Sequence, residues 1–225
     1  MYNWKRIDKF IEDNQWRGAK HFKVGHNKFS DWTEGEYQKL LGFAAPAEKQ
    51  AKNYMMPAHM MRNGHRVADS IDWRDYGYVG EVQDQGMCGA DWAFTANGAV
   101  QGAFAVQQGK LTELSVQQLV DCTGSSTGCS GGTMSQAFDY LETSYAMTAA
   151  DYPYQSAYPA RNECKYDESK ATTCMVDSYT YAEKGDIDMM KKALSHQPIA
   201  ASLNASSMSF QTYLSGVYDD ETCDT

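Results

Sequence analysis

The residue types best suited to chemistry lie in residues 85–94, which read Gln-Gly-Met-Cys-Gly-Ala-Asp-Trp-Ala-Phe. This short segment holds a carboxamide (Gln85), a thiol (Cys88) and a carboxylate (Asp91). A carboxamide can donate a hydrogen bond to a developing oxyanion, and a thiolate can attack an acyl carbon. A carboxylate is a far weaker nucleophile, and its attack on an amide would give a mixed anhydride. Asp91 is also suited to a structural role, because a short anionic side chain stabilises the start of a helix.

A buried helix is expected to position this segment. Residues 90–108 carry small and apolar side chains on nearly every side of a helix, which is typical of a helix inside a protein. Further elements are predicted along the chain, as helices over 114–120, 134–145 and 188–194 and as strands over 178–181 and 198–203. Helices that come first and strands that come later favour an α+β fold with two subdomains.

The first 43 residues form a separate stretch. Ile7, Phe10 and Ile11 give an apolar stripe with helical spacing, and residues 21–24 alternate like a strand. A second helix is predicted to start at a cap formed by Ser30 or Asp31 and to end at Gly42, whose lack of a side chain suits a helix stop. Residues 44–68 show no sustained period, and we expect an extended connector or a segment that lies along a groove.

Residues 85–94 resemble the active-site segment of the papain family of cysteine peptidases, Gln-Gly-x-Cys-Gly-Ser-Cys-Trp-Ala-Phe. Seven of its nine specified positions are unchanged here. The two departures are Ala90, where the family has serine, and Asp91, where it has the reactive cysteine. Further segments are similar to the family and follow in its order: 71–74, 114–122, 128–132, 152–154, 197–198, 209–213 and 216–218.

The N-terminal stretch resembles the inhibitory propeptide of the cathepsin L-like members. Gly25, Asn27, Phe29 and Asp31 match its Gly-x-Asn-x-Phe-x-Asp motif in full. The resemblance implies that this propeptide occupies the cleft in the direction opposite to substrate. It also implies a division into a propeptide-like segment (1–68), a helical left subdomain (69–176) and the start of a barrel-like right subdomain (177–225), which would be incomplete.

The resemblance assigns roles to several residues. Gln85, six residues before position 91, would be the oxyanion-hole donor, and Gly131, Gly132 and Met134 would form the substrate-side wall. The alternative for Met134 is a plain core residue. The catalytic histidine and asparagine are expected about 130–150 residues after the nucleophile, and thus beyond the end of the chain. His21, His26, His59 and His65 lie in the propeptide-like part, and His196 is expected at a helix end.

The six cysteines suit disulfides in an oxidising compartment. By resemblance, Cys88 pairs with Cys129 and Cys122 pairs with Cys164. Cys223 would pair with a partner past the end, and Cys174 is either a buried thiol or part of another bridge. The family implies the secretory pathway, in a lysosome-like or extracellular location. The chain shows no signal-peptide core, so either a secretion signal lies outside this sequence or the protein is not secreted.

Composition excludes several classes of function. A formal charge of −9 argues against binding of nucleic acid, and no apolar run is long enough to span a membrane. No Cys-x-x-Cys pair points to zinc, and we expect neither a metal nor a cofactor. The implied partners are protein or peptide substrates and the chain's own propeptide.

Two functions remain open. The first is a cysteine endopeptidase zymogen by descent, inactive in this form because Asp91 replaces the nucleophile. The second is a natural pseudopeptidase that serves as a structural or binding module, with assembly partners of its own.

Overall fold

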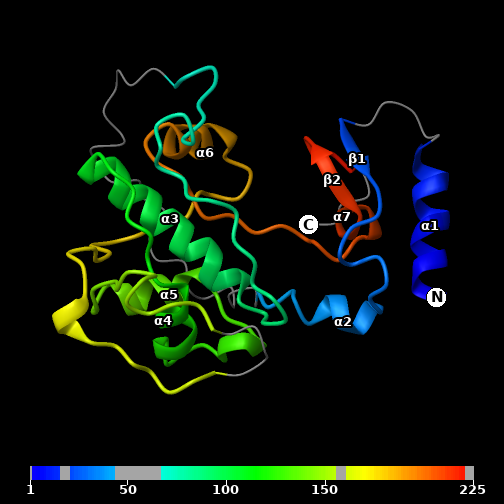
Figure 1. Ribbon diagram of the computed structural model, residues 1–225. Coiled ribbons are helices and arrows are strands. Elements are labelled where there is room, and N and C mark those ends of the chain that lie inside the picture. Colours follow the sequence, from blue (N-terminus) through cyan, green and yellow to red (C-terminus); the bar gives the residue numbers. More distant parts are fainter. Residues whose placement is uncertain (1, 16–20, 44–66, 156–160, 221–225) are drawn as a thin grey trace. The chain divides into compact units, whose positions relative to one another are not determined.

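The computed structural model describes residues 2–15, 21–43, 67–155 and 161–220 (Figure 1). The chain divides into two compact units. The first comprises Met1–Leu41 and Ser202–Thr225, and the second comprises Gly42–Ala201. The functional division expected from the sequence, at residues 68 and 176, stays a prediction.

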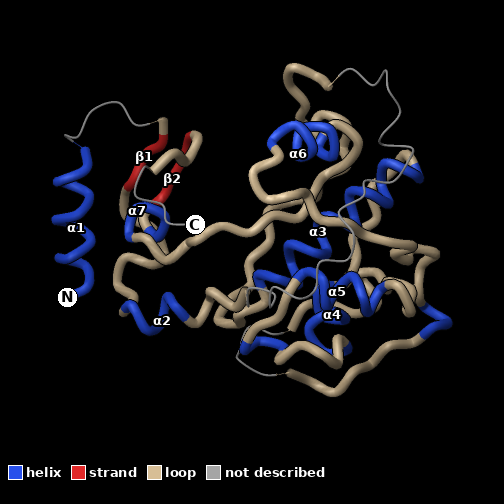
Figure 2. The backbone as a smooth tube through the Cα atoms, turned by 180° about the vertical axis from the view of Figure 1, so that it is seen from behind, coloured by secondary structure: helices blue, strands red, loops and turns tan. Residues whose placement is uncertain are grey.

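The first unit contains a small sheet formed by one strand from the N-terminal part of the chain and one from the C-terminal part. Strand β1 (Phe22–Val24) pairs antiparallel with β2 (Tyr213–Gly216), with Phe22 opposite Gly216. Figure 2 shows the two strands side by side. Where the structure describes it, this unit also contains helices α1 (Tyr2–Gln15), α2 (Glu34–Gln38) and α7 (Met208–Gln211). The predicted apolar stripe of α1 is buried at Ile7 and Ile11.

The propeptide-like motif is bonded to the C-terminal segment of the first unit. The Gly25 amide donates to the Thr212 carbonyl at 2.9 Å, and Asn27 Nδ2 donates to the Gln211 carbonyl at 2.7 Å. The Asn27 side-chain oxygen also accepts the Phe29 amide, which fixes the turn. Phe29 packs edge-on against Tyr37 with a centroid distance of 5.4 Å. The motif therefore contacts this segment through the backbone amide of Gly25 and the side chain of Asn27.

Helix α2 is shorter than the sequence predicts. Its N-cap is Thr33, which forms a capping box with Glu36, and neither Ser30 nor Asp31 caps it. The Ser30 hydroxyl instead accepts a hydrogen bond from the backbone amide of Asn27 within the preceding turn. The helix ends at Gln38, so Gly42 is not its stop. The better cap prevailed because a reciprocal Thr–Glu pair satisfies two backbone donors at once.

The second unit is built on the buried helix predicted at the active-site segment. Helix α3 (Asp91–Gln108) has Gly109 as its C-cap, and the positive φ of 72° at that position suits glycine. It is flanked by α4 (Val116–Cys122) and α5 (Met134–Leu141), as Figure 1 shows. The remaining elements are the short 3₁₀ helices η1 (Gly128–Ser130) and η2 (Glu168–Lys170) and helix α6 (Ile187–Leu194). The core of this unit gathers Trp92, Ala93 and Ala96 of α3 with Leu119 of α4 and Leu141 of α5.

Both disulfides implied by the resemblance are present. Cys88 is bonded to Cys129, and Cys122 to Cys164. Cys174 is a buried free thiol, and burial raises its pKa to about 12, which keeps it protonated. The predicted bridge of Cys223 lies outside the described residues.

The two predicted strands of the second half are not strands in the described structure. Residues 178–181 and 198–201 of the second unit are irregular, as are residues 202–203 of the first. An alternating sequence sets which face a side chain takes, but a strand also needs a neighbouring strand to bond with. The Tyr179 hydroxyl donates instead to Asp139 Oδ1 at 2.8 Å.

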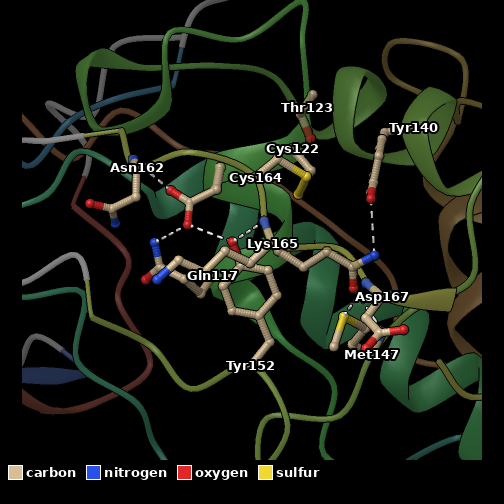
Figure 3. The surroundings of a disulfide bond; sticks show 12 residues. Gln117, Cys122, Thr123, Tyr140, Met147, Tyr152, Asn162, Cys164, Lys165 and Asp167 are labelled. Carbon is tan, nitrogen blue, oxygen red and sulfur yellow. Dashed lines mark hydrogen bonds between the residues drawn. A yellow bond between two sulfur atoms is a disulfide. The ribbon is translucent and has the colours of Figure 1, made fainter. Parts of the chain in front are cut away.

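A buried carboxylate organises the region around the second disulfide. Asp121 is 2% exposed, and its Oδ2 accepts hydrogen bonds from Gln117 Nε2 and the Tyr152 hydroxyl, each at 2.9 Å. Its Oδ1 accepts a hydrogen bond from the backbone amide of Asn162 at 2.9 Å. Figure 3 shows Gln117, Tyr152 and Asn162 converging beside Cys122 and Cys164. Burial raises the pKa of Tyr152 to about 12, so its hydroxyl remains a donor.

Replacing this carboxylate should destabilise the second unit. We expect Asp121→Ala to lower the free energy of unfolding by about 3 kcal/mol, because three donors lose their acceptor in a buried place. Urea unfolding measures the change. Asp177→Ala, at an exposed carboxylate, is the matched control and should shift stability by less than about 0.5 kcal/mol. Equal effects in both variants would show that the Asp121 network contributes little.

Candidate active site

The candidate site lies at the N-terminal end of helix α3. Ala90 is the N-cap and offers no side-chain hydrogen bond, and Asp91 is the first helical residue. Asp91 Oδ1 accepts the backbone amide of Trp92 at 2.9 Å. The carboxylate therefore satisfies one of the free amides of the first turn, where the helix dipole favours negative charge. Asp91 is therefore not the N-cap that the sequence predicted, although its carboxylate bonds an amide of the first turn.

The second oxygen of Asp91 contacts another part of the chain. Oδ2 accepts the backbone amide of Phe43 at 3.1 Å. Next to this bond, the Gly132 amide donates to the Gly42 carbonyl at 3.0 Å, and Phe43 forms a parallel bridge with Gly132. The dipeptide Gly42–Phe43 thus lies extended over the start of α3 and is held from two sides.

Gly42 and Gly131 make this approach possible, and Gly132 leaves room for the Trp92 ring. A Cβ on Gly42 would overlap the carbonyl oxygen of Gly89, and a Cβ on Gly131 would come within 2.5 Å of the Gly42 carbonyl oxygen. Gly131 also has a φ of +129°, which side chains rarely adopt. A Cβ on Gly132 would lie 2.6 Å from the Trp92 ring. The close approach of a backbone agrees with the predicted reason for glycine at 131, whereas a side chain at 132 would meet the side chains of Trp92 and Ser126. A substrate-binding role for either glycine stays a prediction.

The other predicted site residues are placed as follows. Gln85 Nε2 donates to the Cys88 carbonyl at 2.8 Å, and the Gln85 carbonyl accepts the Tyr154 hydroxyl. Gln85 also lines an open pocket beside α3 together with Phe94. Met134 begins α5 and is partly buried against the core, so the core role left open for it has structural support. Its place in a substrate wall stays a prediction.

Burial governs the protonation of Asp91. Removal from water raises the pKa of its carboxyl group, while the amides of Trp92, Phe43 and Gly42 act in the opposite direction. Burial outweighs these hydrogen bonds, so the folded chain disfavours the charged form relative to the unfolded chain.

Among the residues that the structure describes, no histidine is found to pair with Asp91. His21 and His26 belong to the first unit, where they contact Asp219 and Asp8. His196 follows α6, and its amide donates to the Ala193 carbonyl, as expected of a residue at a helix end. His59 and His65 lie outside the described residues.

The sequence did not single out Phe43 or predict that Gly42 would contact the site. Nothing in their types marks them, because their contribution is a backbone amide and a backbone carbonyl. The only signal was their position just before residues 44–68, which were predicted to lie along a groove. Most of that segment, residues 44–66, lies outside the described residues.

Comparison with known proteins identifies the class to which this fold and site belong. The model of the family described as "Papain family cysteine protease" matches residues 67–225. The chain is 37% identical over 213 residues to the probable cysteine protease RD21B of Arabidopsis thaliana, covering 94% of this chain and 45% of that protein. It is also 35% identical over 230 residues to cathepsin S of Mus musculus, covering 98% of this chain and 65% of that protein. The chain thus spans about half the length of the first curated relatives it matches.

Solved proforms give the same result. The digestive procathepsin L2 proteinase of Tenebrio molitor larval midgut superposes with a TM-score of 0.85 at 28% identity, covering all of this chain and 73% of that one. Procathepsin L 3 from the same source gives a TM-score of 0.81 at 30% identity, covering 99% and 71%. The chain belongs to the papain family of cysteine proteases and has the α+β fold of its cathepsin L-like proforms.

The raised pKa of Asp91 predicts how stability depends on pH. A carboxyl group whose pKa is raised by folding contributes most in acid, below its ordinary value of 3.8, and the contribution is lost as pH rises through the folded pKa. We therefore expect the stability of wild type relative to Asp91→Asn to fall as pH rises across this range. Urea unfolding of both proteins at a series of pH values measures this difference. A difference that grows with pH would contradict the direction of the shift.

Gly42 provides a steric test of the site. We expect Gly42→Ala to displace the dipeptide, because its methyl group would overlap the backbone of Gly89. Gly98→Ala is the matched control, since a Cβ on that glycine of α3 meets nothing within 4 Å. Thermal unfolding should show a lower midpoint for the first variant and no loss for the second. Equal midpoints would show that the dipeptide is not held at this place.

Proposed function

We propose that this chain is a papain-family endopeptidase proform that does not hydrolyse peptides, because residue 91 carries a carboxylate where the family has its thiol. The observation that carries the proposal is the engagement of both Asp91 oxygens by backbone amides, those of Trp92 and Phe43. A group that accepts hydrogen bonds on both sides is held as a ligand. It is not presented as a free nucleophile.

The chemistry supports this conclusion. Hydrolysis in the family requires a thiolate that attacks the scissile carbonyl and forms a thioester. Attack by Asp91 would instead form a mixed anhydride, from a carboxylate that burial already disfavours in its charged form. Cys88 cannot replace the missing thiol, because it is bonded to Cys129. Loss of a catalytic nucleophile typically reduces turnover by several powers of ten.

The remaining roles follow from the resemblance. We assign Gln85 to the oxyanion hole and Gly131, Gly132 and Met134 to the wall along which a peptide binds. The partners of the site are protein or peptide ligands and the chain's own propeptide. The two disulfides favour an oxidising compartment, such as a lysosome or the extracellular space. None of the helices in the described ranges is long and apolar enough to cross a membrane.

A pseudopeptidase that acts as a binding module is the second candidate. It is favoured by the two amides that the Asp91 carboxylate accepts at the start of α3. Under this hypothesis the site retains peptide binding and the rest of the catalytic machinery has no function.

Restoring the thiol tests the proposal. The complete gene product and its Asp91→Cys variant are assayed with a fluorogenic dipeptide and with a thiol-directed epoxide label, at acidic and neutral pH. We expect no turnover and no label at position 91 in the wild type. Because Cys174 is a free thiol, peptide mapping must locate the label. Turnover by the wild-type protein would overturn the proposal.

The variant distinguishes the two candidates. Turnover in Asp91→Cys would show that the other catalytic groups are intact and would support descent as an endopeptidase zymogen. A folded variant without turnover would favour the binding module. Asp177→Cys, at an exposed position of the same unit, controls for the added thiol.

A further inference from the structure

One sequence pattern of the first unit has no part in the candidate active site. Asn204-Ala205-Ser206 is an Asn-x-Ser triplet whose middle residue is not proline. The other seven asparagines of the chain are not followed by serine or threonine at the second position. Such a triplet accepts an N-linked oligosaccharide when it lies on the surface of a protein that enters the secretory pathway. Because the triplet also arises by chance, its structural surroundings decide whether it can serve as an acceptor.

The triplet lies on an exposed and irregular segment. Asn204 and Ser206 are both exposed, and residues 202–206 belong to neither a helix nor a strand. Leu203, directly before the asparagine, is 58% exposed. An oligosaccharide attached to Asn204 can therefore extend into solvent, and the folded unit can carry it.

The two polar side chains of the triplet are bonded to each other. Asn204 Oδ1 accepts hydrogen bonds from the Ser206 backbone amide at 3.0 Å and from the Ser206 hydroxyl at 2.6 Å. Because a backbone amide can only donate, the side-chain atom that meets it is the carboxamide oxygen and not the nitrogen. Asn204 Nδ2, the atom that would carry the sugar, is thus engaged by neither donor.

The backbone of the triplet is held while its asparagine stays accessible. The Ala205 carbonyl accepts a hydrogen bond from the Tyr37 hydroxyl at 2.9 Å. Tyr37 is buried, and burial raises its pKa to about 12, so the hydroxyl remains a donor. Directly after the triplet, the Ser207 hydroxyl caps α7 by accepting a hydrogen bond from the Phe210 amide at 3.2 Å. These contacts use groups other than the Asn204 carboxamide, so a modified asparagine leaves them intact.

We propose that Asn204 is an N-glycosylation site and that the chain carries an asparagine-linked oligosaccharide there. The inference goes beyond the proposed function, because it holds whether or not residue 91 supports catalysis. It shares with that function only the oxidising compartment, since N-linked glycosylation takes place in the secretory pathway.

The modification forms one bond and breaks another. The co-reactant is an oligosaccharide linked through a diphosphate to a membrane lipid. Asn204 Nδ2 bonds to C1 of the first N-acetylglucosamine and gives up one proton. The bond between C1 and the diphosphate oxygen breaks, and the lipid diphosphate leaves with its electron pair. No group is oxidised or reduced.

Peptide mapping of the complete gene product tests the site. The protein is produced in insect cells and treated with an N-glycosidase in ¹⁸O water. The glycosidase converts a glycosylated asparagine to aspartate and places the heavy oxygen on the new carboxylate. We expect this label at residue 204 and a faster electrophoretic mobility after treatment. A sample kept in ¹⁸O water without the glycosidase measures spontaneous deamidation.

Two substitutions of the hydroxyl residue sharpen the test. Ser206→Ala keeps the asparagine and removes the hydroxyl, so both the label and the mobility shift should be lost. Ser206→Thr retains a hydroxyl and should retain both signals. Ser202→Ala, at an exposed serine outside the triplet, is the matched control and should also retain them. Label at Asn204 in Ser206→Ala would overturn the proposal.

The disulfides show whether the chain reached the required compartment. An unlabelled Asn204 in wild-type protein that has formed Cys88–Cys129 and Cys122–Cys164 would overturn the proposal. An unlabelled Asn204 together with reduced cysteines would overturn both the proposal and the oxidising compartment. Failure of the proposed lack of peptidase activity is detected separately, as turnover of the fluorogenic dipeptide by the wild type.

Discussion

The candidate site depends on how closely the Gly42–Phe43 backbone approaches the start of α3. Glycine at 42 and 131 allows that approach, and the Asp91 carboxylate and the Gly132 amide hold the dipeptide in it. Each of these contacts involves backbone atoms. The site is therefore specified by where side chains are absent as much as by where they are present.

Aspartate at position 91 reconciles two requirements that usually oppose each other. A helix start has unbonded amides and a favourable dipole for an anion, while burial penalises the charge. In this chain burial is the larger influence on the pKa, yet both oxygens have amide partners. In its charged form the carboxyl group has an amide partner on each oxygen, and these bonds offset part of the cost of burial. The proposed lack of peptidase activity rests on the same two bonds.

The scaffold that positions the site relies on buried polar groups and two covalent links. Cys88–Cys129 ties the loop before α3 to the loop that carries Gly131 and Gly132. Cys122–Cys164 lies next to the Asp121 network, which joins α4 to two later segments through Tyr152 and Asn162. Each disulfide restricts the unfolded chain and so lowers the entropy lost on folding. Site residues that are far apart in the sequence are brought together at a smaller cost.

The family, the buried helix α3, the strand β1 and, through resemblance, both disulfides could be predicted from the sequence. These features follow from local periodicity or from a motif whose residue types are specific. Other features depend on contacts between segments that are far apart in the chain. Strands predicted at 178–181 and 198–203 are irregular where the structure describes them, because strand formation depends on a bonding neighbour. Thr33 caps α2 because it forms a reciprocal bond with Glu36, and Gly42 contacts Gly89 and does not end a helix. The hydrogen bond from Phe43 to Asp91 could not be predicted from residue types, because every residue except proline has a backbone amide.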